Sequence, residues 1–294
     1  MTKDEFRILY ALPPETKVKK TQQRIREFYY HFGGSVFLSF SGGKDSTVLG
    51  HIIKSMGKPF SDIEFVFFDT HNEQPSVYNI VREWNATVIS SPYTPQEVVE
   101  KVGYPLFNKE LAHTMDAMKR GLNYAKNTKN PHSLELMEEC RGRLKLFLEA
   151  PLMISDKCCT LSKKRPSAEF IKKTGKYPIL ATLATESYLR MQQYLKRGCN
   201  AFEGEIKSTP LGFWNKKDIL WYIAQNDLKI ADCYKAKISV YPLLNYKTCK
   251  LCGVEQTGCL YCGFGKGIEF AKKVLKAKCP EYVAQHLQEF NDLH

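Results

Sequence analysis

The chain carries Val36-Phe37-Leu38-Ser39-Phe40-Ser41-Gly42-Gly43-Lys44-Asp45-Ser46-Thr47, in which an apolar run is followed at once by glycines, a lysine and hydroxyl side chains. Residues 36–40 are typical of a short buried strand, and residues 46–56 of a helix that follows it. Glycines let backbone amides approach an anion, and a helix N-terminus adds free N–H groups and a favourable dipole. Lys44 can neutralise a phosphate, and the hydroxyl groups can donate to its oxygens. The stretch therefore predicts a phosphate-binding loop.

The surrounding sequence alternates strands and helices. Residues 63–68 read as a second strand that ends in Asp69-Thr70, residues 75–84 as a helix with proline in its first turn, and residues 86–90 as a third strand. This order is typical of a parallel α/β sheet flanked by helices. The loop is not a Walker loop, which has four residues between its first glycine and Gly-Lys. Asp69 and Thr70 lie where an open α/β sheet places its ligand crevice, although Asp69 could instead cap a helix or form a turn.

We predict three segments along the chain. Residues 1–32 form an N-terminal helical segment, residues 33–240 a nucleotide-binding α/β domain, and residues 241–294 a Cys-rich module with terminal helices. Residues 241–267 are rich in Cys, Gly and Tyr with little periodicity, which is typical of a small fold organised by a metal. The other predicted elements are helices over 17–31, much of 95–150, 187–196, 219–225 (opened by an Asn215 cap with Asp218 at N3), 268–278 and 281–290, and a strand over 176–183.

Composition and charge limit the class of protein. Hydrophobic residues make up 43% of the 294 residues and charged residues 25%, as in an ordinary folded domain. We see no secretory signal at the start and no run of eighteen apolar residues, so we expect a cytoplasmic protein that does not span a membrane. The formal net charge of +12 favours a polyanionic partner, either nucleic acid or a phosphate-rich small molecule. A solvated basic surface without a specific partner is the plainer alternative.

Ten cysteines are many for a reducing compartment, where disulfides are rare. All but Cys140 lie between Cys158 and Cys279, and such clustering indicates metal ligation or catalysis. The pairs Cys249-x2-Cys252 and Cys259-x2-Cys262 could together supply the four thiolates that zinc prefers. Cys158 and Cys159 are adjacent, which adds a third pair. Four cysteines have no partner at such spacing and are expected to be ordinary small buried residues: Cys140, Cys199, Cys233 and Cys279.

The string Ser41-Gly42-Gly43-Lys44-Asp45-Ser46 resembles the PP-loop of ATP pyrophosphatases, a superfamily that includes phosphoadenosine phosphosulfate (PAPS) reductases and tRNA thiolation enzymes. Further elements resemble the PAPS reductase family in particular and follow its order. They are Asp156-Lys157-Cys158-Cys159 with Lys163-Lys164-Arg165-Pro166, Glu186-Ser187-Tyr188-Leu189-Arg190, and Pro210 with Phe213-Trp214, Asp218-Ile219 and Tyr222-Ile223. The resemblance covers roughly residues 33–265. Without it, Glu186 and Arg190 would read as an i, i+4 surface pair.

The resemblance implies that ATP or a related adenine nucleotide binds with magnesium. In such relatives the bond between the α and β phosphates is cleaved and an adenylated intermediate forms. By this resemblance, Lys44, Asp45 and Arg190 act in catalysis. The nucleotide-binding residues that it implies are Ser41, Gly42, Gly43, Lys44, Asp45, Ser46, Thr47, Asp69, Thr70, Glu186, Ser187 and Arg190.

A Cys-Cys pair and a distant Cys-x2-Cys bind a [4Fe–4S] cluster in similar adenylylsulfate reductases. The resemblance therefore implies such a cluster here, with zinc as the alternative. Cys259 and Cys262 are the first two ligands expected, and the other two come from Cys158, Cys159, Cys249 and Cys252.

The resemblance does not extend to the tail cysteine of sulfonucleotide reductases, because no cysteine follows Cys279. Three functions therefore stay open. The first is adenylation of a target, with nucleic acid as one candidate, followed by sulfur transfer that depends on the cluster. The second is reduction of a sulfonucleotide, and the third is nucleotide sensing without catalysis. The sequence does not indicate an oligomeric state.

Overall fold

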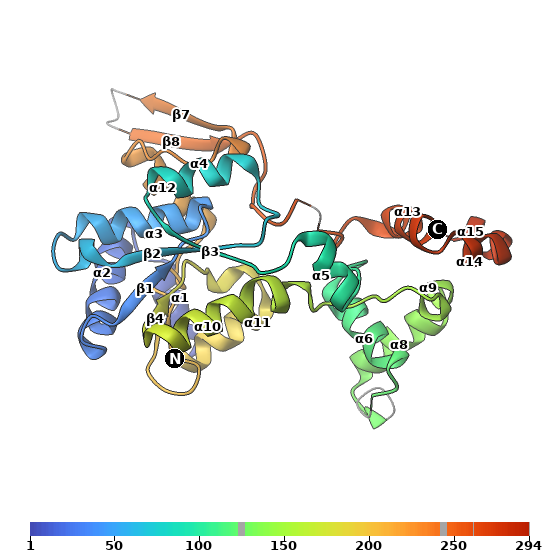
Figure 1. Ribbon diagram of the computed structural model, residues 1–294. Coiled ribbons are helices and arrows are strands. Elements are labelled where there is room, and N and C mark those ends of the chain that lie inside the picture. The colour runs from blue at the N-terminus through green and yellow to red at the C-terminus, as the bar shows by residue number, and fades with distance from the viewer. Residues whose placement is uncertain (123–126, 242–245, 261, 294) are drawn as a thin grey trace. The chain divides into compact units, whose positions relative to one another are not determined.

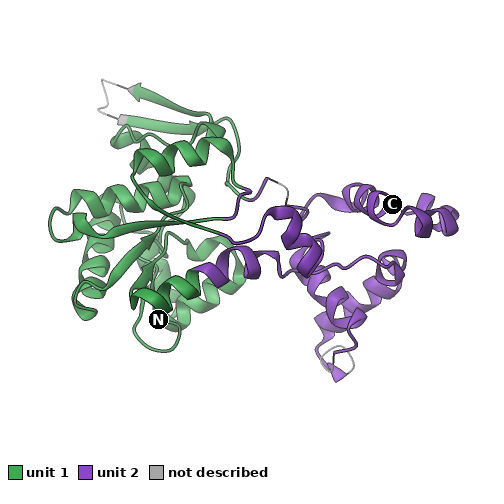
Figure 2. Ribbon diagram, viewed as in Figure 1, with its two compact units in different colours: residues 1–69, 73–90, 167–258 green, residues 70–72, 91–166, 259–294 purple. Residues whose placement is uncertain are grey.

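The computed structural model describes residues 1–122, 127–241, 246–260 and 262–293. The chain divides into two compact units (Figure 2). Unit 1 comprises residues 1–69, 73–90 and 167–258, and unit 2 comprises residues 70–72, 91–166 and 259–294. These boundaries differ from the three predicted segments, because residues 91–166 belong to one unit with the terminal helices.

Unit 1 is built on a six-stranded sheet with the order β3-β2-β1-β4-β6-β5 (Figure 1). All neighbouring strands are parallel except β5, which runs antiparallel to β6. The predicted parallel α/β architecture is therefore confirmed. The strands are β1 Val36–Ser39, β2 Glu64–Asp69, β3 Thr87–Ser90, β4 Tyr177–Ile179, β5 Asn200–Ala201 and β6 Lys207–Ser208. The strand predicted over 176–183 is thus shorter than expected.

Helices cover both faces of this sheet. Alternate residues such as Leu38 and Phe67 belong to the main core with α2, α3, α4 and α12, while Phe37 and Phe68 pack on the other face against Phe170 of α10. The helical elements with residues in unit 1 are α1 Lys3–Tyr10, α2 Pro14–His31, α3 Lys44–Ser55, η1 Phe60–Asp62, α4 Pro75–Glu83, α10 Arg165–Thr174, η3 Ala184–Glu186, α11 Tyr188–Arg197, α12 Lys216–Gln225 and η4 Asp232–Tyr234.

A buried ion pair joins α2 to α12. Lys17 Nζ donates to Asp218 Oδ2 at 2.6 Å, and the two side chains are 1% and 7% exposed. The same carboxylate accepts the Asn215 N–H at 2.8 Å, which completes the predicted capping box at the start of α12. Beside it, Trp214 Nε1 donates to Thr21 Oγ1 at 2.9 Å. The Trp and Asp-Ile elements of the family resemblance therefore lie in the core and fix α12 against α2.

A two-stranded antiparallel hairpin follows η4 in unit 1. It consists of β7 Ala236–Tyr241 and β8 Tyr246–Leu251, with Ile238 opposite Cys249. We predicted little regular structure from residue 241 onward, so this hairpin was missed. The sequence signal is weak because all of residues 236–240 are exposed, and only the β8 side rests on the main core, through Cys249 and Leu251.

Unit 2 is helical around its own core, which combines Met115 and Phe147 with Leu275 and Phe290. The residues predicted as mostly helical over 95–150 form several separate helices. The helical elements of unit 2 are α5 Pro95–Val102, α6 Lys109–Lys119, α8 Pro131–Arg141, α9 Lys145–Glu149, η2 Thr160–Lys164, α13 Gly267–Lys278, α14 Pro280–Gln285 and α15 Leu287–Asn291. In the described part of the chain, no helix is both long and apolar enough to cross a membrane.

Candidate functional site: a phosphate loop and a cysteine cavity

The predicted phosphate loop joins β1 to α3, with Gly43 as the N-cap residue of α3. Gly42 has a φ of 66°, and a Cβ atom there would lie 2.8 Å from Val77 Cγ1 of α4. Both the backbone conformation and the close approach of α4 therefore require glycine at position 42.

Hydroxyl groups hold the loop in shape. Ser46 Oγ and Thr47 Oγ1 both donate to the Gly43 carbonyl, at 2.9 and 3.0 Å. Ser41 Oγ lies 3.0 Å from Ser46 Oγ and accepts the Gly43 N–H at 3.3 Å. The hydroxyl groups that we predicted as phosphate donors thus form hydrogen bonds within the loop. They fix the conformation of the backbone that an anion would meet.

Lys44 is the first residue of α3 and is only 3% exposed. Its Nζ donates to Asp45 Oδ2 at 3.0 Å and lies 5.7 Å from the centre of the Tyr234 ring. The other carboxylate oxygen, Asp45 Oδ1, is buried and has no hydrogen-bond partner within the described part of the chain. A buried carboxylate oxygen without a partner is costly, so this atom is suited to an incoming cation or donor.

Glu186, Ser187 and Arg190 lie where η3 passes into α11. Ser187 caps α11 by accepting the Arg190 N–H at 3.3 Å, and the Arg190 guanidinium forms an ion pair with Glu186. Partial burial lowers the pKa of Arg190, and the nearby Asp45 carboxylate opposes that shift. The Arg190 guanidinium therefore lies within electrostatic range of Asp45 in the phosphate loop, while its ion-pair partner is Glu186.

Asp69 and Thr70 stand at the end of β2. Asp69 is buried and accepts a hydrogen bond from Tyr78 Oη at 2.8 Å. Burial, reinforced by this bond and by the charge of Asp69, raises the pKa of Tyr78. Thr70 belongs to unit 2, where it lines the cavity described next.

Four cysteines line one cavity in unit 2, with a volume of about 70 Å³: Cys158, Cys159, Cys259 and Cys262. The first two open a helix that continues through the π-helical segment η2 into α10. Their Sγ atoms are 4.0 Å apart. π-helical segments occur often at functional sites, and a helix N-terminus favours thiolates.

The charge around this pair favours a thiolate at Cys159. The hydrogen bond from the Cys158 thiol lowers the pKa of Cys159 to about 6, and the positive charges of Lys109, Lys163 and Lys164 act in the same direction. The pKa of Cys158 is raised, because its thiol donates that bond and because it is buried. Lysines from α6 and η2 of unit 2 thus place positive charge near Cys159.

Cys249 and Cys252 are not among the residues that line this cavity. Both belong to unit 1, where Cys249 lies in β8 and packs against the main core, and Cys252 follows the strand and is exposed. Among the residues that the structure describes, no group of three or more metal-binding side chains is arranged to hold a single metal ion.

Two residues at the loop were missed by sequence reasoning. Tyr234 Oη accepts the Lys44 N–H at 3.1 Å and lies 3.1 Å from Thr257 Oγ1. Tyr234 is 190 positions from Lys44 in the chain, and no local pattern marks it or Thr257.

Comparison with known proteins gives one family and a similar structure. The model of the phosphoadenosine phosphosulfate reductase domain matches residues 35–102 and 104–263. Among solved structures, the chain is similar to phosphoadenylyl-sulfate (PAPS) reductase from Candida auris in complex with phosphate. The identity is 17%, the match covers 79% of this chain and 90% of that chain, and the TM-score is 0.41. No curated protein matches the sequence.

Proposed function

The chain belongs to the phosphoadenosine phosphosulfate reductase family, and from this membership we propose that it is an enzyme that binds ATP at the loop 41–47. In this proposal it cleaves ATP between the α and β phosphates, adenylates a target, and so prepares the target for sulfur transfer. The proposal places this reaction in the cytoplasm, a reducing compartment in which cysteines stay available as metal ligands.

The observation that carries the proposal is the burial of Lys44 and its ion pair with Asp45 at the start of α3. A buried ammonium group and the N-terminus of a helix together favour a phosphate. Asp45 Oδ1, buried and without a partner in the described residues, suits magnesium, which prefers carboxylate and phosphate oxygens. The residues present therefore fit magnesium with a nucleotide polyphosphate, and the metal would neutralise charge on the phosphates.

Lys44 and Arg190 supply the positive charge that this reaction needs. Cleavage between the α and β phosphates builds negative charge on the departing pyrophosphate, and fixed cations stabilise that charge in the transition state. The Asp45 carboxylate pairs with Lys44 Nζ and attracts the Arg190 guanidinium, which is itself paired with Glu186. Positioning and electrostatics account for catalysis without a protein nucleophile.

The cavity in unit 2 supports the proposed [4Fe–4S] cluster. Its four cysteines surround a space, which suits a cluster of several atoms, whereas a single zinc ion needs four thiolates that converge on one point. We therefore propose Cys158, Cys159, Cys259 and Cys262 as the ligands and leave out the pair in unit 1. When bound, the cluster would deliver sulfide or hold it for transfer.

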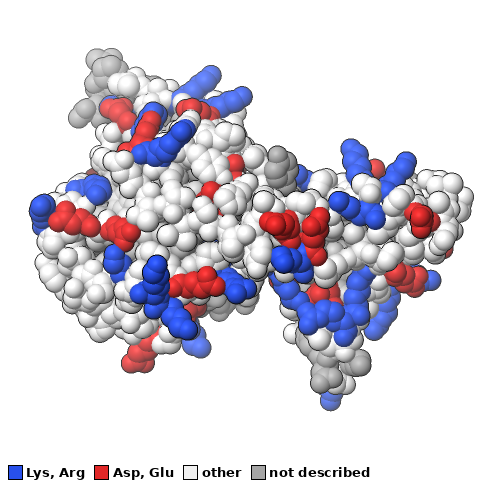
Figure 3. All heavy atoms as spheres, in the orientation of Figure 1, with Lys and Arg blue, Asp and Glu red and all other residues white. Residues whose placement is uncertain are grey.

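Nucleic acid is our proposed acceptor class, on the basis of the net charge of +12. On the face drawn in Figure 3, basic side chains lie beside acidic ones over unit 1, and several basic side chains gather over the helices of unit 2. The charge supports a polyanionic acceptor without indicating where it binds.

Reduction of a sulfonucleotide is the second candidate, and the family match favours it directly. The two candidates differ in their products, since adenylation releases pyrophosphate and reduction releases sulfite. We expect pyrophosphate release from ATP that depends on added RNA or DNA, and no sulfite from PAPS with thioredoxin. Sulfite release would replace the first candidate by the second.

The role of the loop is tested with Lys44→Ala beside Lys19→Ala, an exposed lysine of α2. Isothermal titration with ATP and magnesium should show binding to the wild type and to Lys19→Ala, and at least tenfold weaker binding to Lys44→Ala. Equal affinities of all three proteins would remove the loop from the site.

The cluster is tested by iron and sulfide analysis of anaerobically purified protein. Cys259→Ser should lose iron, whereas Cys252→Ser should keep it. If Cys252→Ser also lost its iron, the proposed ligand set would be wrong. One zinc and no iron in the wild type would overturn the cluster altogether.

A further inference from the structure

We propose that the hydroxyl groups of Tyr234 and Thr257 form a hydrogen-bond relay, a chain of hydrogen bonds that links the N-terminus of α3 to the nucleotide phosphate. Both are then positioning residues of the phosphate site, with Thr257 as the group that donates to a phosphate oxygen. This inference rests on the proposed nucleotide function, and it names two side chains that neither the loop sequence nor the family resemblance indicates.

The direction of the relay follows from its two hydrogen bonds. The Lys44 N–H, one of the free donors at the start of α3, donates to Tyr234 Oη at 3.1 Å. Tyr234 is 1% exposed, and Thr257 Oγ1, at 3.1 Å, is the acceptor that the described residues offer to its proton. A buried phenol proton without an acceptor is costly, so Tyr234 donates to Thr257. The Thr257 proton is then free to donate to an anion.

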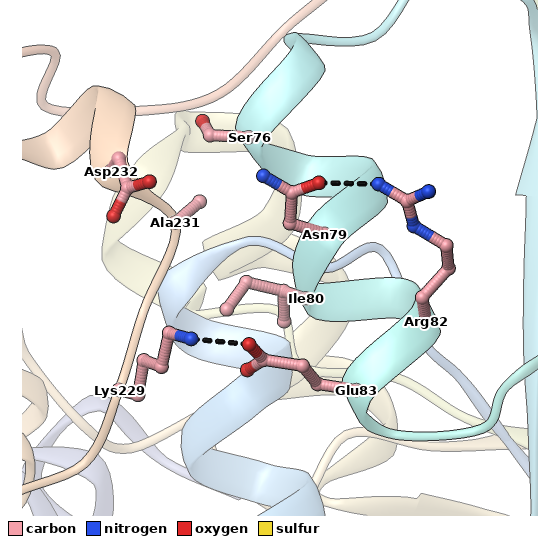
Figure 4. A pocket seen from close by; sticks show the side chains of 8 residues that line it. All are labelled: Ser76, Asn79, Ile80, Arg82, Glu83, Lys229, Ala231 and Asp232. Carbon is pink, nitrogen blue, oxygen red and sulfur yellow. Dashed lines mark hydrogen bonds and ion pairs between the residues drawn. The ribbon is translucent and has the colours of Figure 1, made fainter.

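Tyr234 is held firmly enough to act in this way. Its ring belongs to the main core, and η4, which carries it, is fixed to α4. The Cys233 N–H donates to Ser76 Oγ at 3.2 Å, and Lys229 forms an ion pair with Glu83 (Figure 4). Because α4 also packs against Gly42 through Val77, one helix sets the positions of both the loop and the relay.

Thr257 lies directly against the loop. A Cβ atom on Gly43 would come within 2.9 Å of Thr257 Oγ1 and 3.2 Å of Tyr234 Oη. Glycine at position 43 therefore makes room for the relay as well as for an anion. Thr257 itself is only partly buried, so its hydroxyl can reach a ligand, whereas Tyr234 is enclosed.

The relay determines which hydrogen-bond donors reach the phosphate. Tyr234 occupies the Lys44 N–H, so that donor reaches the anion only through the two hydroxyls. Burial raises the pKa of Tyr234, which keeps the phenol protonated and able to donate at neutral pH. Chains of hydrogen bonds strengthen one another in a low-dielectric environment, so loss of either hydroxyl should break the whole relay.

The test measures binding of inorganic pyrophosphate and, separately, of ATP by isothermal titration. Tyr234→Phe and Thr257→Val each remove one hydroxyl and keep the shape of the side chain. Each should raise Kd for pyrophosphate about five- to tenfold. The double variant should be no weaker than about the worse single variant, because the two act as one unit. Thr257→Ser should bind like the wild type.

Tyr194→Phe is the matched control, because Tyr194 is also a buried tyrosine whose hydroxyl group is hydrogen-bonded, to Cys199 Sγ at 3.0 Å. It should leave Kd unchanged. Unchanged binding by Thr257→Val, independent effects of the two substitutions, or no binding of pyrophosphate by the wild type would each overturn the relay. Because pyrophosphate binding needs no turnover, the relay can stand even if ATP cleavage is never observed, and it can fail while cleavage stands.

Discussion

Removal of the buried ammonium group of Lys17 should destabilise unit 1 strongly. In Lys17→Met the apolar stem is kept, but Asp218 loses its partner 2.6 Å away and remains a buried carboxylate. We expect this substitution to lower the free energy of unfolding of unit 1. Because Asp218 also caps α12, the N-terminus of that helix should loosen first.

The magnitude follows from burial. Both side chains are less than a tenth exposed, so water cannot replace the lost partner. Breaking a buried ion pair on one side costs about 3–5 kcal/mol. With a urea m-value of about 2 kcal/mol per M, the midpoint of unfolding should fall by about 1.5–2.5 M. The double variant Lys17→Met/Asp218→Asn leaves no unpaired charge, so it should recover about half of that loss.

Tryptophan fluorescence during urea titration is a suitable assay, since Trp84, Trp214 and Trp221 all belong to unit 1. Lys19→Met, on the exposed face of the same helix, is the control and should shift the midpoint little. If Lys17→Met were no less stable than Lys19→Met, or if the double variant were less stable than Lys17→Met, the reasoning from an unpaired buried charge would be refuted.

Three further substitutions test other features. Gly43→Ala should raise Kd for ATP about tenfold in a titration, because its Cβ would lie 2.9 Å from Thr257 Oγ1. An unchanged Kd would show that the segment carrying Thr257 moves aside without affecting ATP binding. Burial lowers the pKa of His51 below 6.5, so the unfolded chain binds that proton more readily and unit 1 should lose stability as pH falls through about 6.5. His51→Gln should flatten this dependence in urea titrations at pH 7.5 and 5.5, and an equally steep dependence would contradict it. Lys119→Met removes donors to two backbone carbonyls of unit 2 and should speed hydrogen exchange there, which unaltered protection would disprove.

The sequence predicted the sheet because its signals are local. The run from Val36 to Thr47 contains a buried strand, a glycine turn and a helix start within twelve residues, and each is read from its own neighbours. The capping box of Asn215 and Asp218 is equally local and was confirmed. The order of the family motifs added Arg190 to the expected site, and the charge of Asp45 acts on its guanidinium.

What could not be predicted depends on contacts between distant parts of the chain. Tyr234 accepts a hydrogen bond from Lys44 although 190 positions separate them in the chain, and a single tyrosine outside any motif gives no sequence signal of such a contact. The grouping of the cysteines is similar. Spacing alone does not distinguish the pair at Cys249 from the pair at Cys259. The packing of the hairpin against α12 and the main core places the first pair in unit 1, whereas the second belongs to unit 2.

The interleaving of the two units sets an order of events during synthesis. The core of unit 2 combines residues such as Phe147 with Leu275 and Phe290, so it cannot close until the last helices have left the ribosome. Cys158 and Cys159 are synthesised about a hundred residues before Cys259 and Cys262, so they are at first without the two later cysteines of their cavity. The proposed cluster, which needs all four cysteines, can be inserted only once Cys259 and Cys262 have been synthesised, and until then a reducing environment is needed to keep the early pair as thiols.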